Sequence, residues 1–309
     1  MGLEAVIFRA PVWSVNKNPN RKRGFYGSSP NKQYEYDHRY DTALYLDKEF
    51  TDHKAAVLKA AYERVKQEGR EYGGPAVIET FGEEGFKPLN KKEALSLSRD
   101  QEKLTIAHAN ECTRISNDYV PGDETSFTII AFPKPSIGKD FKEIFEETIR
   151  INTLDYEEYK RMQQAVIDRL DKAEYVVITG RGENKTDLKV NLHKLADPAK
   201  ETNFENCVAD VNIPVGEVFT SPVLKGTKGR LQVGSVYIGN FQFKNLVMEF
   251  EDGKVVSYGC DNFEDKEAGR ALVKQVIMKN HDTLPIGEFA IGTNTVAYAM
   301  AQRFGIVDK

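Results

Sequence analysis

The first half of the chain alternates between helical and extended hydrophobic patterns. In residues 52–69, apolar side chains recur every three or four positions, which predicts an amphipathic helix. Asp52 stands where a cap is expected, and Gly69 stands where the helix should end. Residues 75–82 predict a short buried strand, and residues 98–118 predict a second helix.

The same alternation continues to about residue 173. Residues 126–133 predict another strand that a proline ends, and residues 140–173 predict a long helical region. Asn, Thr and Asp at 152–155 favour caps over a helix interior, so we expect a break there. Because strands alternate with helices, this half predicts an α/β fold with a mainly parallel sheet.

After Asp171 the pattern becomes rich in strands and turns. The segments EYVVITG, TDLKVNL, EVFTSP and GSVYIGNFQFKNLVMEFEDGKVVSYG predict strands, with YIGN and EDGK as hairpin turns. The sequence therefore predicts two domains with a boundary near residues 165–172. The first is an α/β N-terminal domain over residues 1–168, and the second is a strand-rich domain over residues 169–309.

Composition narrows the class of protein. The chain has 309 residues, of which 40% are hydrophobic, and a formal charge of −4, which argues against a nucleic-acid partner. No apolar run approaches the roughly 20 residues of a membrane span, and the N-terminus lacks the pattern of a secretory signal. Three widely spaced cysteines, Cys112, Cys207 and Cys260, favour reduced thiols in a cytoplasm. The basic cluster at 16–24 is interpreted as a solvated loop rather than a phosphate or targeting site.

Several patterns resemble chemical sites but have simpler interpretations. His108 and Cys112 lie four apart on a predicted helix, a spacing that can hold a metal, yet they share its apolar stripe, so packing is favoured. GRGENK at 180–185 is followed by a strand, so no helix N-terminus is available to bind a phosphate. His38 lies in an aromatic and acidic segment that favours a surface or interface cluster over a ligand set.

One pattern occurs twice, as IPVGE at 213–217 and LPIGE at 284–288. Proline restricts the backbone and glycine permits a sharp path, so each glutamate follows a stiffened turn. The alternation in EVFTSP places Glu217 on one face of a strand and Val218 on the other. If Glu217 and Glu288 converge, they suit two divalent metals about 3.5–4 Å apart. The alternative is that both glutamates form ion pairs at the starts of strands or helices.

Longer segments around these glutamates resemble a known family. DVNIPVGEVFTSPVLKGTKG and LPIGEFAIGTN resemble the two glutamate motifs of the thermophilic-metalloprotease aminopeptidases, and SFTIIAFPKPSIGKDF and GENKTDLKVNL resemble two further stretches of that family. The similarity covers roughly residues 50–309. It implies a two-domain homodimer that removes N-terminal amino acids from peptides with two divalent metal ions, usually zinc or cobalt. It also implies that Glu217 and Glu288 are metal ligands and that the second domain is the metal-binding catalytic domain.

The chain also departs from the family pattern. The family's remaining ligands come from a later histidine-containing stretch and a His-x-Asp motif, neither of which occurs before Lys309. His281 lies on the wrong side of Glu288 to match a ligand and is interpreted as a surface or outer residue. The resemblance therefore predicts a C-terminally incomplete aminopeptidase with little activity, whose general base is not identified. The alternatives are a non-catalytic peptide-binding or structural α/β fragment and, with only the fold class to support it, a nucleotide-using enzyme.

Overall fold

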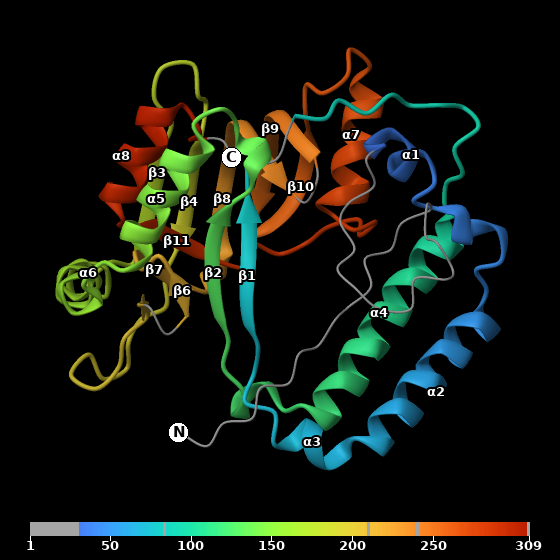
Figure 1. The fold of residues 1–309 in the computed structure, drawn as a ribbon, viewed down its shortest axis with the longest axis horizontal. Helices are drawn as coiled ribbons and strands as arrows, with labels where there is room; N and C mark the ends of the chain where they lie inside the picture. Colours follow the sequence, from blue (N-terminus) through green and yellow to red (C-terminus); the bar gives the residue numbers. More distant parts are fainter. Residues whose placement is uncertain (1–30, 83–84, 209–210, 239–240, 308–309) are drawn as a thin grey trace.

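A computed structural model describes residues 31–82, 85–208, 211–238, 241–307 of the chain (Figure 1). The basic cluster at 16–24 lies outside the described residues. The first half contains α1 (Lys32–Asp37), α2 (Lys48–Arg64), α3 (Lys66–Arg70), β1 (Ala76–Phe81), α4 (Arg99–Tyr119), β2 (Thr128–Pro133), α5 (Phe141–Asn152) and α6 (Tyr156–Leu170). The second half contains β3 (Tyr175–Thr179), β4 (Asp187–Asn191), β5 (Glu205–Cys207), β6 (Asn212–Ile213), β7 (Glu217–Thr220), β8 (Val223–Ile238), β9 (Phe241–Glu251), β10 (Lys254–Gly259), α7 (Lys266–Val276), β11 (Phe289–Gly292) and α8 (Thr295–Phe304). Single turns of 3-10 helix lie at Asp41–Leu44, Gly122–Glu124 and Pro135–Ile137.

The first half forms the predicted βαβ unit, in which β1 and β2 are parallel and α4 connects them. The predicted break near residues 152–155 is confirmed, since α5 ends at Asn152 and the side chain of Asp155 caps α6. The capping prediction for α2 is wrong: Asp47 accepts from Phe50 N at 2.8 Å and caps the helix, whereas Asp52 pairs with Lys48 on its surface. Gly69 lies inside α3 instead of ending the helix.

The prediction that β1 is buried is also wrong. Ile78 is 66% exposed, because α4 packs against the neighbouring helix α2 through a stack of Tyr62 and Tyr119. On the other side of β2 the sheet gains β6, which comes from the second half of the sequence and pairs with β2 in parallel.

The second half is strand-rich, as predicted. Its larger sheet is antiparallel, with the order β10-β9-β8-β4-β3, and its inner face packs on α7 around Phe243, Leu272 and Val273. The two hairpins predicted from YIGN and EDGK join β8 to β9 and β9 to β10, although residues 239–240 at the first turn are not described. The smaller sheet has the order β11-β7-β5 and carries the first glutamate motif.

Elements from the two halves of the sequence pack and pair with each other. Helix α8, at the C-terminal end of the described chain, lies beside α5 (Figure 1) and packs on Ile144 through Met300 and Phe304. Together with β6, this contact joins elements from either side of the expected boundary at residue 168. The division into domains 1–168 and 169–309 stays a prediction. In the described residues, no helix is both long enough and apolar enough to cross a membrane.

Candidate functional site

Glu217 is the first residue of the central strand β7 of the small sheet. Within this ladder it lies opposite Cys207 of β5 on one side and Gly292 of β11 on the other. Val218 is fully buried while Glu217 is partly exposed, which confirms the alternation expected from the sequence. Glu217 therefore projects from the face of the sheet opposite to the apolar core.

That core shows what covers the back of the sheet. Val218, Phe289 and Ile291 pack against Ile167 and its neighbours on α6. Because side chains alternate between faces, Ala290, Gly292 and the residue two before Ala290, Glu288, face the same way as Glu217. Glu217 therefore lies on the front face, with α6 behind, and because Glu288 immediately precedes β11, we expect the same alternation to place it on this face too.

The two motifs reach this face by different routes. Gly216 has φ 138°, and a Cβ added there would lie 2.5 Å from the Cβ of Asn294, so only glycine fits before Glu217. The second motif is held by the β9–β10 hairpin, since Ile286 N donates to Gly253 O at 2.7 Å. Glu288 itself is exposed and immediately precedes β11.

The register separates the two glutamates along the strand. Phe289 pairs with Thr220, so Glu288 lies four positions along the ladder from the residue opposite Glu217. Four residues of strand rise correspond to about 13 Å between backbone positions. The convergence of the carboxylates on one metal pair stays a prediction.

The two glutamates nevertheless interact electrostatically. Burial raises the pKa of the Glu217 carboxyl above its ordinary value, and the negative charge of Glu288 raises it further. A hydrogen bond from Asn212 Nδ2 to Glu217 Oε2, 3.2 Å long, acts in the opposite direction. In the part of the chain that the structure describes, neither glutamate forms an ion pair. The ion pairs of the simpler interpretation are therefore not found among these residues.

Glu217 and Glu288 meet part of the requirements of a divalent metal site. Two carboxylates on one face with no lysine or arginine partner supply the oxygen ligands and the negative charge that a divalent metal uses. Yet the described residues contain no group of three or more His, Cys, Asp or Glu side chains that could hold a metal ion. The described residues therefore supply two candidate carboxylate ligands, Glu217 and Glu288, and not a complete set of metal ligands.

Polar residues that the sequence analysis did not identify surround Glu217. Asn212 also donates to Cys207 Sγ at 3.3 Å. Asn294 Nδ2 donates to Val215 O at 2.7 Å, and Asn294 Oδ1 caps α8. Asn212 and Asn294 lie within the two motif segments that resemble the family. Their closeness to the glutamates in the sequence is the one feature that could have identified them as site residues.

The other sequence candidates lie apart from the glutamates. On α4, His108 Nε2 is 3.6 Å from Cys112 Sγ, and burial followed by Lys54 lowers the pKa of the His108 imidazole. His38 pairs with Asp41 at 2.9 Å, and its ring lies 4.3 Å from the Tyr34 ring at an interplanar angle of 42°. His281 lies in the turn after α7, where its N–H donates to Met278 O. The turn at 180–185 joins β3 to the antiparallel β4, which confirms that no helix follows it.

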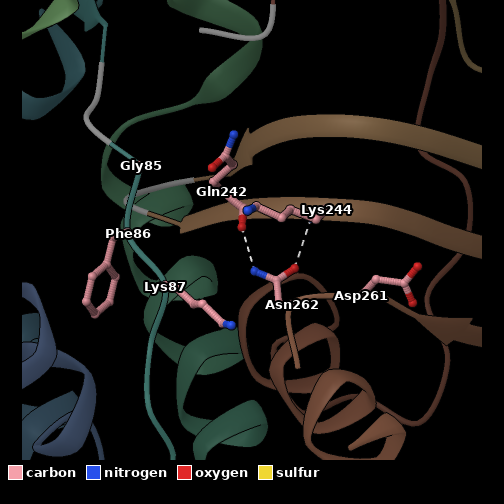
Figure 2. Close-up of a pocket in the computed structure, with 7 residues that line it drawn as sticks. All are labelled: Gly85, Phe86, Lys87, Gln242, Lys244, Asp261 and Asn262. Carbon is pink, nitrogen blue, oxygen red and sulfur yellow. Dashed lines mark hydrogen bonds between the residues drawn. The ribbon is translucent and has the colours of Figure 1, made fainter. Parts of the chain in front are cut away.

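A separate cavity of about 220 Å³ lies between residues 85–87 and the edge of β9 (Figure 2). Asn262 organises it, because its Nδ2 donates to Gln242 O at 2.6 Å and its Oδ1 accepts from Lys244 N at 2.9 Å. Among the described residues that line it, Asp261 is acidic and pairs with Lys266 at 2.6 Å. Neither repeated glutamate lines this cavity.

The described residues form a mixed α/β protein with a parallel sheet and two antiparallel sheets, and among them Glu217 and Glu288 form no ion pair. This chain belongs to the thermophilic metalloprotease family (M29), which it matches over residues 90–304. Family membership confirms the resemblance inferred from the glutamate motifs and associates the chain with metal-dependent peptidases.

Two further comparisons add context. The solved structure of wild-type AmpT from Thermus thermophilus is similar at 19% sequence identity with a TM-score of 0.46. The match covers 87% of this chain and 65% of that chain, so this chain spans less than two thirds of its length. A comparison with curated proteins finds no match.

Proposed function

We propose that this chain is a metal-dependent aminopeptidase that releases N-terminal amino acids from peptides, with Glu217 and Glu288 as ligands of a two-metal site. One observation supports this proposal above the others. The two glutamates share the front face of the small sheet without an ion-pair partner among the described residues, and the charge of Glu288 raises the pKa of Glu217. Membership of a metalloprotease family gives this pairing a chemical reason.

Each residue around the front face has a task in this proposal. Glu217 and Glu288 hold the metal ions, either Zn²⁺ or Co²⁺, and Asn212 fixes the rotation of the Glu217 carboxylate. A bound divalent metal supplies Lewis acidity toward the scissile carbonyl and lowers the pKa of a water molecule. The family resemblance implies that the free amine of the peptide is held at this site, which makes the reaction an exopeptidase reaction. The proposal includes a homodimer, as the family resemblance implies, and a cytoplasmic location, as the three widely spaced cysteines favour.

The number of candidate metal ligands limits the metal affinity and the hydrolytic activity that we expect of this chain. A structural or catalytic zinc ion takes about four donors and gains much affinity from imidazole. The described residues offer two carboxylates and no group of three ligands. We therefore expect weak metal binding and little aminopeptidase activity from the 309-residue chain as given.

The test combines metal titration with a hydrolysis assay. Co²⁺ and Zn²⁺ binding is measured by calorimetry for the wild type, Glu217→Gln, Glu288→Gln and the control Glu251→Gln, whose carboxylate is exposed on β9. We expect weak binding in the wild type and the control, and at least tenfold weaker binding in both motif variants. Hydrolysis of amino-acyl anilides is measured in the same samples.

Two outcomes would contradict the proposal. If the wild type and both motif variants bind metal equally, or none of them binds, Glu217 and Glu288 are not metal ligands. The chain is then better described as a non-catalytic peptide-binding or structural protein. Full hydrolytic activity in the motif variants would have the same meaning for the two glutamates.

A further inference from the structure

Gln163 on α6 is a fully buried amide beneath the small sheet, and nearly all its hydrogen-bonding capacity is used. Its Nε2 donates to Asn206 Oδ1 at 2.7 Å and to Cys207 O at 3.0 Å. Its Oε1 accepts from the Thr293 hydroxyl at 2.7 Å. Burying an amide is unfavourable unless it is hydrogen-bonded, so this satisfied geometry strongly restrains all three partners.

The partners of Gln163 lie on both sides of Glu217. Cys207 of β5 is directly opposite Glu217 in the ladder, and Thr293 follows Gly292, which is opposite Glu217 on the other side. Thr293 N also donates to Gly216 O at 2.8 Å, one residue before the glutamate. One side chain therefore joins the two strands that flank Glu217, and through Thr293 it restrains the turn that presents this carboxylate.

The same contact connects the two glutamate motifs. Thr293 lies five residues after Glu288 at the far end of β11, so a shift of β11 moves both its end and its beginning. The helix that carries Gln163 covers the back of this sheet through Ile167 and Val218, whereas Glu217 faces the front and Glu288 is expected to face it as well. Gln163 thus touches neither carboxylate, and it acts through the positions of the strands.

We propose that Gln163 is the positioning residue of the metal site, holding β5, β7 and β11 in the register that presents Glu217 and Glu288 together. This inference rests on the proposed function. Residues that orient metal ligands typically change metal affinity by 10–100-fold when they are substituted. Replacing Thr293 by valine removes its hydrogen bond to Gln163 and leaves the other hydrogen bonds of Gln163 in place.

The experiment compares variants of nearly equal shape. Thr293→Val removes the hydroxyl, Thr293→Ser keeps it, and Gln163→Met removes the amide while keeping an unbranched side chain. Thr51→Val is the control, because Thr51 is buried and its hydroxyl donates to Lys48 O on the remote helix α2, whereas Thr293 is partly buried. The Co²⁺ dissociation constant and the visible Co²⁺ spectrum are measured beside the melting temperature of each metal-free protein.

We expect Thr293→Val and Gln163→Met to weaken Co²⁺ binding by about tenfold and to alter the Co²⁺ spectrum. Thr293→Ser should restore both. Thr51→Val should lower the melting temperature about as much as Thr293→Val without changing Co²⁺ affinity, which separates positioning from general stability.

The failures of the two proposals are distinguishable. If the wild type binds Co²⁺ and Glu217→Gln abolishes binding, but Thr293→Val and Gln163→Met bind like the wild type, the positioning role is overturned and the proposed function stands. A Thr51→Val variant that loses affinity as strongly as Thr293→Val would also overturn it. If the wild type binds no Co²⁺, the proposed function fails and the inference fails with it.

Discussion

Glu217 is the residue whose surroundings are least usual for its type. Its carboxylate lies at the start of a central strand, is partly buried and is raised in pKa by the nearby charge of Glu288. Among the described residues it accepts a hydrogen bond from the amide of Asn212 and forms no ion pair. Folding therefore favours its protonated form. Such an arrangement is stabilised when a cation arrives, and without one it costs stability at neutral pH.

The first prediction concerns the pH dependence of this cost. Because the pKa of Glu217 in the fold lies above its ordinary value of 4.5, ionised Glu217 is disfavoured in the folded state relative to the unfolded state. Stability contributed by the protonated form is present below the unfolded pKa and is lost as pH rises through the folded pKa. In metal-free protein, Glu217→Gln should raise the melting temperature near pH 7 and leave it nearly unchanged near pH 4. Thermal melts at both pH values measure this, and an equal effect at both would contradict it.

The second prediction concerns Gly216. An alanine there adds a Cβ that lies 2.5 Å from Asn294 Cβ, and φ 138° is unfavourable for any L-residue with a side chain. We expect Gly216→Ala to destabilise the protein by about 1–3 kcal/mol. The control is Gly234→Ala on β8, where an added Cβ meets nothing within 4 Å. Denaturant unfolding of both variants gives the comparison, and equal losses would refute the close approach.

At the scale of elements, helix α8 and the first glutamate motif depend on one side chain. Asn294 caps α8, since its Oδ1 accepts from Ala297 N at 2.8 Å. The same amide donates through Nδ2 to Val215 O at 2.7 Å, in the turn before Glu217. The start of a helix and the start of a strand are therefore fixed to each other.

The third prediction separates these two contacts. Asn294→Asp keeps an oxygen that caps α8 but loses the donor to Val215, whereas Asn294→Ala loses both. Loss of an N-cap costs about 1 kcal/mol, and loss of a hydrogen bond costs about 0.5–1.5 kcal/mol. We expect the alanine variant to be clearly less stable than the aspartate variant in chemical denaturation. Equal stability would show that the cap contributes nothing.

At the scale of the whole molecule, two elements from the second half of the sequence pack against elements from the first half. Strand β6 extends the parallel sheet of the first half, and α8 packs on α5 through Met300 and Phe304. If residues 169–309 are separated from residues 1–168, β6 loses its partner strand and the apolar face of α8 becomes exposed.

The fourth prediction follows from this packing. A fragment of residues 169–309 alone should melt without a sharp transition or associate, because exposed apolar faces promote association. Circular dichroism melts and light scattering measure this, with the full chain as the control. A fragment that melts as cooperatively as the full chain would instead support an independent second domain with a boundary near residue 168.

The sequence by itself determined the local features of this protein. Hydrophobic periodicity predicts β1, β2 and α4 to α6, and Asp155 marks the start of α6. The alternation in EVFTSP places Glu217 and Val218 on opposite faces of the strand. These features depend on residues close together in the chain, where spacing and turn chemistry act directly. The length of the glutamate motifs likewise identified the family without any structural information.

Only the tertiary structure decided which segments lie together. The exposure of Ile78, the pairing of β6 with β2 and the register of Glu288 relative to Glu217 depend on contacts between distant segments. Gln163 looks like an ordinary polar residue of an amphipathic helix, yet it is fully buried because Asn206, Cys207 and Thr293 meet it there. Local periodicity carries no information about which strand pairs with which, since that choice depends on how well whole elements pack.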